Sequence, residues 1–282
     1  MFARVASLRL WLRRQWLYPW IGALTVAIVI GGQPLVARSA DLIQFLAPLV
    51  QYVQLSNVSD AQEISLGADT NRALLNDKVK IYQNSAANSY VDRIGQRLAR
   101  NSGRPNLKYT FQVVEDDNVN AFATMGGFVY VNTGLLKAAD NEAQLAGVMG
   151  HEIGHITGRH SLQRLKQATV QQGIGSLVGV DRNQIAQIAA QVAFNLPNSR
   201  NDEYDADKRG LGMMIQSGYA PTGMPEFLKK LARGSSTPEF LNTHPGASER
   251  VSRLQGMIPN TYRNRTEGLS ASAYKQNLRS FF

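Results

Sequence analysis

The spacing of hydrophobic residues changes along the chain and separates helical from extended stretches. Between residues 88 and 101 apolar side chains recur every three or four positions, which predicts an amphipathic helix ending at Ser102-Gly103. Residues 107–114 and 128–131 alternate instead, as strands do, on either side of a turn region that contains Gly126-Gly127. Helical spacing then returns. The expected fold class is α+β and mainly helical, with a small β-sheet bordering the helix that follows it.

The N-terminal region has the pattern of an export signal. A group of arginines precedes an uncharged, mostly apolar run over residues 20–32, and small residues follow. We expect cleavage near Ala37 or Ser39; the alternative is a retained signal anchor, because residues 15–37 carry no charge. We expect residues 41–58 to form an amphipathic linker that is too short to span a membrane and instead either touches its surface or packs on the folded body.

A capping pattern at Ser59-Asp60 marks the expected start of the folded domain. The chain is therefore divided into a signal segment over residues 1–40, the linker over 41–58, one catalytic domain over 59–260 and a polar tail over 261–282. The tail ends in Phe281-Phe282, carries no clear chemistry, and is expected either to dock or to be disordered.

Composition and charge narrow the classes of function. The 282 residues are 44% hydrophobic and 18% charged, which is ordinary for a globular protein. Because there is no cysteine, any bound metal must be held by His, Asp or Glu. The formal net charge is +9, but the first 40 residues contain five arginines and no acid, which leaves +4 for the remainder. A weakly basic body of this kind does not indicate nucleic-acid binding.

The clearest chemical pattern is His151-Glu152-Ile153-Gly154-His155, which lies in a helical stretch. Residues four apart lie about 40° apart around a helix, so the two imidazoles point the same way. That arrangement suits one zinc ion, with Glu152 beside the metal as a candidate general base. The alternative is a solvated helix that carries two incidental histidines.

A third ligand is expected in the segment 202–207, which holds four acids. Acids are common at the positive end of a helix, so this cluster alone does not define a metal site. Catalytic zinc nevertheless often takes two histidines and one carboxylate and leaves its fourth position for water. Glu203 and Asp207 lie four apart on one helical face, so one can bind metal while the other accepts the N–H of a ligating histidine.

The strand just before the metal-binding helix, residues 128–131, is a candidate for substrate binding. A free strand edge there can bind an extended polypeptide through main-chain hydrogen bonds. An ordinary strand inside a sheet is an equally good interpretation, because proteins usually protect unpaired edges.

Taken in order, these motifs resemble a known family. The His-Glu-x-x-His motif, Glu203 with Ala206-Asp207, and Thr243-His244-Pro245 with Arg250 are similar to the gluzincin metalloproteases that include the CAAX prenyl protease and the bacterial heat-shock membrane protease. The likeness covers about residues 60–257 and also takes in Glu63 to Gly67, Asn120 to Ala123, Gly126-Gly127 and Arg159-His160. Soluble periplasmic quality-control members resemble the chain most, because its catalytic unit lacks multiple hydrophobic spans.

The resemblance implies a zincin-like catalytic domain and a role for each matching residue. His151, His155 and Glu203 would bind one Zn²⁺, Glu152 would act as the base, and Asp207 would orient a ligand. The matching segments that would bind substrate are Asn120, Ala121, Phe122, Gly126 and Gly127.

The resemblance also places His244 and Arg250 at the cleft, where a cation or an imidazole can stabilise an oxyanion. In a second interpretation His244 becomes a fourth ligand and closes the site. His160 lies nine residues from His151, about half a turn away around a continuous helix, so we expect it to pack or hydrogen-bond without touching metal. Gln144 and Asn198 depart from the family pattern, and neither is expected to touch the ligands.

The activity that the resemblance implies is that of a zinc metalloendopeptidase. It would hydrolyse peptide bonds in exported or envelope proteins that are misfolded or misassembled, in the periplasm or at the outer face of a membrane, with or without an anchor. The alternative is a holdase or assembly factor that binds envelope proteins through the strand edge and keeps its protease activity latent.

Overall fold

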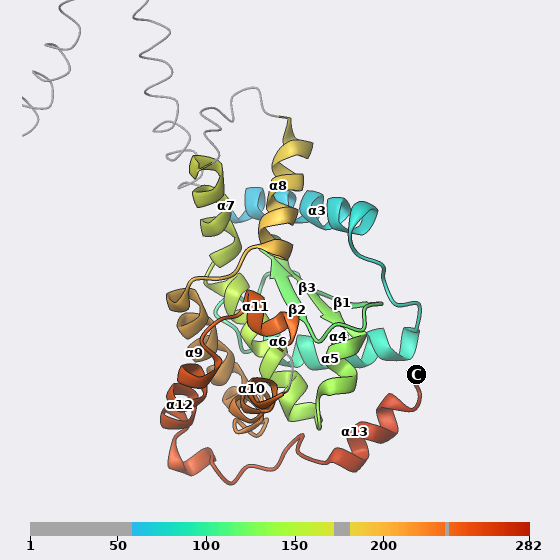
Figure 1. Cartoon of the computed structure of the whole chain (residues 1–282), viewed down its shortest axis with the longest axis vertical. Helices are drawn as coiled ribbons and strands as arrows, with labels where there is room; N and C mark the ends of the chain where they lie inside the picture. The colour runs from blue at the N-terminus through green and yellow to red at the C-terminus, as the bar shows by residue number, and fades with distance from the viewer. Residues whose placement is uncertain (1–57, 172–180, 235–236) are drawn as a thin grey trace, which may run out of the picture.

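The computed structural model describes residues 58–171, 181–234 and 237–282 (Figure 1). The predicted signal segment and residues 41–57 of the linker lie outside these ranges. Within them, no helix has both the length and the apolar character needed to cross a membrane. The expected α+β, mainly helical fold class is confirmed, since one small sheet lies among helices.

The sheet has three strands in the order β1-β3-β2. These are β1 (Thr110–Val114), β2 (Ala121–Thr124) and β3 (Phe128–Asn132). β3 pairs parallel to β1, with Thr110 opposite Phe128, and antiparallel to β2, with Ala121 opposite Val131.

The central position of β3 decides between the two interpretations of this strand, in favour of an ordinary strand inside a sheet. The strand expected over residues 128–131 has neighbours on both sides and therefore offers no free edge. β1 and β2 are the outer strands of the sheet. The sequence pattern did not reveal β2, because all four of its residues are buried and do not alternate.

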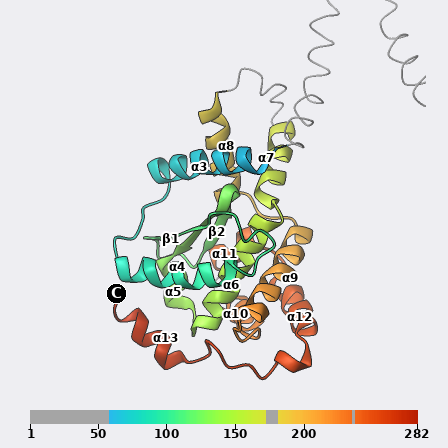
Figure 2. The same ribbon diagram turned by 180° about the vertical axis from the view of Figure 1, so that it is seen from behind.

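Helices cover both faces of the sheet. On one face, α4 (Ser85–Ala99) and α6 (Glu142–Thr157) share the main hydrophobic core with side chains such as Val113, Val129 and Val131. On the other face, α3 (Asp60–Asp77) and α8 (Arg182–Asn195) pack around Phe122 and Tyr130. The view from behind shows α4 and α3 on different sides of the strands (Figure 2). α3 begins where the capping pattern was expected, with a capping box between Ser59 and Gln62.

The remaining elements surround α6 (Figure 1). Short α5 (Thr133–Ala138) leads from β3 toward α6, and α7 (His160–Gln171) follows α6 directly. α9 (Arg200–Gln216), α10 (Gly223–Arg233), α11 (Glu239–Thr243) and α12 (Ala247–Met257) complete the other side. Every residue of α6 from Ala143 to Ile156 is buried, so this helix is the centre of the fold.

The segment after residue 260 is a packed part of the domain. It contains the short turn η2 (Asn260–Tyr262) and α13 (Ala271–Leu278). Tyr274 and Phe281 join the main hydrophobic core, and the Tyr274 hydroxyl donates to the carbonyl of Leu136 at 2.8 Å. Of the two expectations for the polar tail, docking therefore describes it and disorder does not.

Candidate active site

α6 presents the three residues of the metal motif to one enclosed point. Its first turn is capped by Asn141, whose side chain accepts from the backbone N–H of Gln144 at 3.0 Å. Two turns further on, the Nε2 atoms of His151 and His155 lie 3.0 Å apart, and both side chains are at most 2% exposed. The four-residue spacing therefore brings the imidazoles together as the sequence predicts.

α9 brings Glu203 against these imidazoles. Its two carboxylate oxygens lie 3.3 Å from the Nε2 atoms of His151 and His155 respectively. The approach depends on small residues, because a Cβ on Gly154 would lie 2.6 Å from the carbonyl oxygen of Ala206. Glu203 is fully buried, which a solvated acidic cluster would not be.

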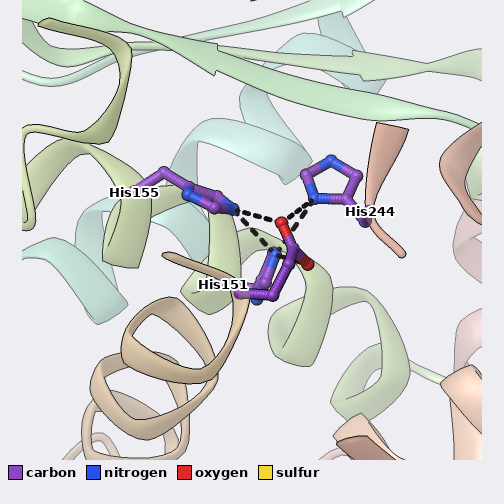
Figure 3. A group of neighbouring side chains, drawn as sticks. His151, His155 and His244 are labelled. Atoms are coloured by element: carbon purple, nitrogen blue, oxygen red, sulfur yellow. Dashed lines mark hydrogen bonds and ion pairs between the residues drawn. The ribbon is translucent and has the colours of Figure 1, made fainter. Parts of the chain in front are cut away.

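His244 completes a group of four. It follows α11, and its Nδ1 lies 3.2 Å from Nε2 of His151 and 3.0 Å from Oε1 of Glu203. The labelled imidazoles in Figure 3 turn toward one point. One ligand atom from each of His151, His155, Glu203 and His244 lies within 4.8 Å of the others. Imidazole nitrogens with one carboxylate are a donor set that zinc prefers, so these residues fit one zinc ion.

Asp207 lies behind His151, one turn along α9 from Glu203. Its Oδ1 is 2.9 Å from Nδ1 of His151, the nitrogen that faces away from the ligand group. A carboxylate in this place fixes the ring orientation and the tautomer of a metal-binding histidine. This is the arrangement that the sequence suggested for one of the two acids.

Arg250 does not lie where the resemblance placed it. Its guanidinium donates to the Asp207 carboxylate from Nε at 2.8 Å and from Nη2 at 2.7 Å. Its Nη1 lies 2.5 Å from Oε2 of Glu203. The side chain is 1% exposed and sits behind the carboxylates. Because these donors are already engaged by acids, they do not match the oxyanion contact expected of Arg250.

The buried charges shift one another's pKa values. Burial would raise the pKa of Glu203, but His244, His151 and Arg250 hold it well below its usual value. Burial would lower the pKa of His151, yet the Glu203 carboxylate and the bond to Asp207 raise it to about 9. Burial and the neighbouring His151 lower the pKa of His155. The Glu203 carboxylate therefore stays ionised, and the pKa values of the two imidazoles are shifted in opposite directions.

Glu152 faces a small cavity beside the ligand group. Burial raises the pKa of this carboxyl, and its Oε1 has no hydrogen-bond partner among the described residues. The cavity is about 10 Å³, on the order of one water molecule. Its lining includes Phe122, Ala123, Glu152, His155, Ala193, Thr243 and His244.

Two further residues line this cavity that sequence reasoning did not assign to it. Arg164 from α7 has an enclosed Nε that meets no acceptor in the described ranges. Asn198 lies 3.1 Å from Nδ1 of His244 and 3.4 Å from Nε2 of His155 through its Nδ2. The expectation that Asn198 stays clear of the ligands is wrong. The sequence held one signal of this contact: Asn198 departs from the family pattern and lies close to the acidic segment 202–207.

The predicted substrate-binding residues separate into two groups. Phe122 on β2 reaches the cavity; Ala121 is the first residue of the same strand, and Asn120 directly precedes it. Gly126 and Gly127 instead form the tight turn η1 (Met125–Gly127) with φ of 78° and 100°. Side chains there would press on α3 or on Lys108, so this turn has a packing role.

A helix that carries two metal-facing histidines and an intervening glutamate, with a glutamate from a second helix, defines the zincin class of metallopeptidase sites. The chain belongs to peptidase family M48, which it matches over residues 85–258. This confirms the resemblance at the level of the family.

Individual relatives agree with this assignment. The beta-barrel assembly-enhancing protease of Escherichia coli (strain K12) is 32% identical over 250 residues, which are 82% of this chain and 50% of that protein. Its namesake from Yersinia pestis is 32% identical over 70% of this chain and 44% of that protein. The mitochondrial metalloendopeptidase OMA1 of Schizosaccharomyces pombe is 27% identical over 74% and 67% respectively. The chain thus spans about half the length of the bacterial relatives.

Proposed function

We propose that the chain is a zinc-dependent endopeptidase whose metal is held by His151, His155 and Glu203. The observation that carries the proposal is the meeting of these ligand atoms with the buried Glu152 carboxylate, whose Oε1 accepts no hydrogen bond from the described residues, in one enclosed site. When bound, zinc supplies Lewis acidity toward a peptide carbonyl and toward water.

In this proposal Glu152 moves the protons. Its raised pKa brings the carboxylate closer to the neutral range in which a general base is most effective. It takes a proton from the attacking water and delivers it to the nitrogen of the departing amine. The enclosed position of Glu152 keeps bulk water from competing for that proton.

Asp207 and Arg250 are proposed to position the ligands rather than to touch substrate. Asp207 holds the outer nitrogen of His151, and Arg250 binds the carboxylates of both Asp207 and Glu203. His244 is proposed as the fourth ligand of a closed site, because its Nδ1 lies within the ligand group while its Nε2 is 3.4 Å from Glu152. The closed arrangement supports this role over oxyanion binding.

The proposed substrate is a polypeptide that binds along β2. This strand lies at the edge of the sheet and leads into the cavity at Phe122. Its outer side is partly occupied, since the Ser161 hydroxyl donates to the carbonyl of Ala123 at 3.2 Å. A peptide that adds to this edge must therefore displace the α7 contact.

We further propose that the substrates are exported or envelope proteins, with the enzyme in the periplasm or at an outer membrane face. Support comes from the export-signal pattern in the sequence and from relatives named as beta-barrel assembly-enhancing proteases.

The test is Glu152→Gln, which keeps the size of the side chain and removes its base. Cleavage of casein or of an unfolded outer-membrane protein should fall at least about a hundredfold, while zinc content stays at one per chain. Glu226→Gln, on exposed α10 surface away from the site, serves as the matched control. Unchanged turnover in the Glu152 variant would refute the assignment.

One observation favours a second function. A cavity of about 10 Å³ cannot admit a peptide, so the chain as described is closed. A holdase or assembly factor with latent protease activity would have such a site. Zinc-loaded wild-type protein that cleaves neither substrate, yet suppresses aggregation as well as Glu152→Gln does, would support this alternative.

A further inference from the structure

His160 connects the metal-facing histidine His155 to a carboxylate on α9. Its Nδ1 lies 2.8 Å from Nδ1 of His155, the ring nitrogen that faces away from the ligand group. Its Nε2 lies 3.2 Å from Oδ2 of Asp205. His160 is itself only 4% exposed. Three side chains therefore run in line from the surface of α9 to the metal site.

The backbone makes a sharp turn to place His160 there. α6 ends at Thr157, and Arg159 adopts φ of 57°, a left-handed conformation that residues with a Cβ rarely take. This turn explains why His160 reaches His155, which a continuous helix would prevent. Gly158 is also required, because a Cβ there would lie 2.3 Å from Nε2 of His160.

α3 holds the turn from outside. Arg159 bonds the fully buried Glu63 through Nε at 2.8 Å and Asp60 through Nη2 at 2.7 Å. Arg104 bonds the second oxygen of Glu63 at 2.9 Å. A strained residue that is fixed by several charge-assisted bonds indicates that the surrounding structure maintains this conformation.

The hydrogen-bond chemistry allows only one arrangement once His155 binds metal. A histidine that offers Nε2 to a metal carries its proton on Nδ1, which must then donate. His160 has to accept through Nδ1, so its own proton is on Nε2 and points at Asp205. The donors therefore run in one direction, from His155 to His160 to the carboxylate.

We propose that His160 and Asp205 are positioning residues for the zinc ligand His155. The inference rests on the proposed zinc site. In it, each of the two ligand histidines is held in place by a carboxylate. Asp207 contacts His151 directly and is held by Arg250, whereas Asp205 acts through His160 and is held by Arg209 at 2.6 Å. The second support fixes the ring orientation of His155 and raises its basicity toward the metal.

Zinc affinity tests the proposal without any protease assay. The dissociation constant is measured by competition with a chromophoric chelator on the full chain. His160→Phe, which fills the space but cannot accept a hydrogen bond, should raise the constant about 10- to 100-fold. His160→Asn should recover most of the affinity, because its amide oxygen takes the place of the imidazole Nδ1 and can accept from His155.

Two acids on α9 give a matched pair of variants. Asp205→Ala should weaken zinc binding severalfold, whereas Asp202→Ala should weaken it less, because Asp202 lies 3.9 Å from Nε2 of His160, beyond hydrogen-bond distance. Both positions are partly exposed, so these variants keep the test valid if His160→Phe fails to fold. The melting temperature of each metal-free variant reports on folding.

The outcomes separate the two claims. Equal zinc affinity for wild type, Asp205→Ala and a folded His160→Phe would overturn the positioning role alone. A wild-type chain that binds no zinc would overturn the proposed function and this inference with it. A loss of affinity that is as large for His160→Asn as for His160→Phe would also contradict the hydrogen-bond argument.

Discussion

At the scale of single residues, Arg250 shows how the site depends on buried charge. It is among the largest fully buried side chains and neutralises two carboxylates, Glu203 and Asp207. Removal of one partner from such a group leaves uncompensated charge in the interior.

Arg250→Met should therefore lower the free energy of unfolding of the metal-free chain by about 3–5 kcal/mol. Urea denaturation followed by circular dichroism measures this change. Arg253→Met is the matched control on the same helix, since Arg253 is exposed and lies over the ring of Tyr204. It should cost at most about 1 kcal/mol. Equal losses for the two variants would show that Arg250 carries no special charge role.

The same scale shows which site residues a sequence can predict. His151, Glu152 and His155 lie within one turn of one helix, so helical spacing is enough to bring them together. Glu203 was one of two candidate acids, and the family resemblance separated it from Asp207. The position of Arg250 depends on how α12 packs against α9, and the contact of Asn198 depends on a loop path. Neither is encoded in local spacing.

At the scale of elements, the contact between α6 and α9 sets the distance between the histidines and Glu203. The helices meet at glycines, and a Cβ on Gly210 would lie 2.8 Å from both the carbonyl carbon of Gly150 and the backbone nitrogen of His151. A larger residue must push α9 away from α6, or distort the first ligand.

Gly210→Ala should destabilise the chain by about 1–3 kcal/mol and weaken zinc binding, because overpacking moves Glu203 away from the imidazoles. Gly212→Ala is a close control, two residues along the same helix, where an added Cβ meets nothing within 4 Å. It should stabilise the helix by up to about 1 kcal/mol. Thermal melts and chelator competition measure both effects, and identical behaviour of the pair would contradict the close-contact account.

Element prediction from the sequence succeeded for one amphipathic helix and for two of the three strands. The helix expected at residues 88–101 corresponds to α4, and the two alternating stretches correspond to β1 and β3. β2 was missed because its four residues do not alternate, and the tail was left open between docking and disorder because Tyr274 and Phe281 are isolated apolar residues in polar sequence. Hydrophobic periodicity does not report either situation.

At the scale of the whole molecule, helices close the site from the side opposite α4. Figure 1 shows α7 and α8 rising from the region of the sheet with α3 across them. Phe194 on α8 packs edge-on against Phe122 of β2, with ring centroids 5.4 Å apart. Cleavage of a polypeptide requires these helices or His244 to move away from the cavity. The sequence could not predict this closure, because it depends on contacts between distant elements.

The central claim is that one zinc ion, held by His151, His155 and Glu203, makes this chain a peptidase. The most direct test titrates metal-stripped protein with zinc and measures bound zinc and peptide cleavage together, beside the ligand variant His155→Gln. The account predicts that cleavage returns in proportion to zinc and saturates at one ion per chain, while the variant binds zinc far more weakly and stays inactive. Cleavage by metal-free protein, or equal zinc binding by wild type and His155→Gln, would contradict it.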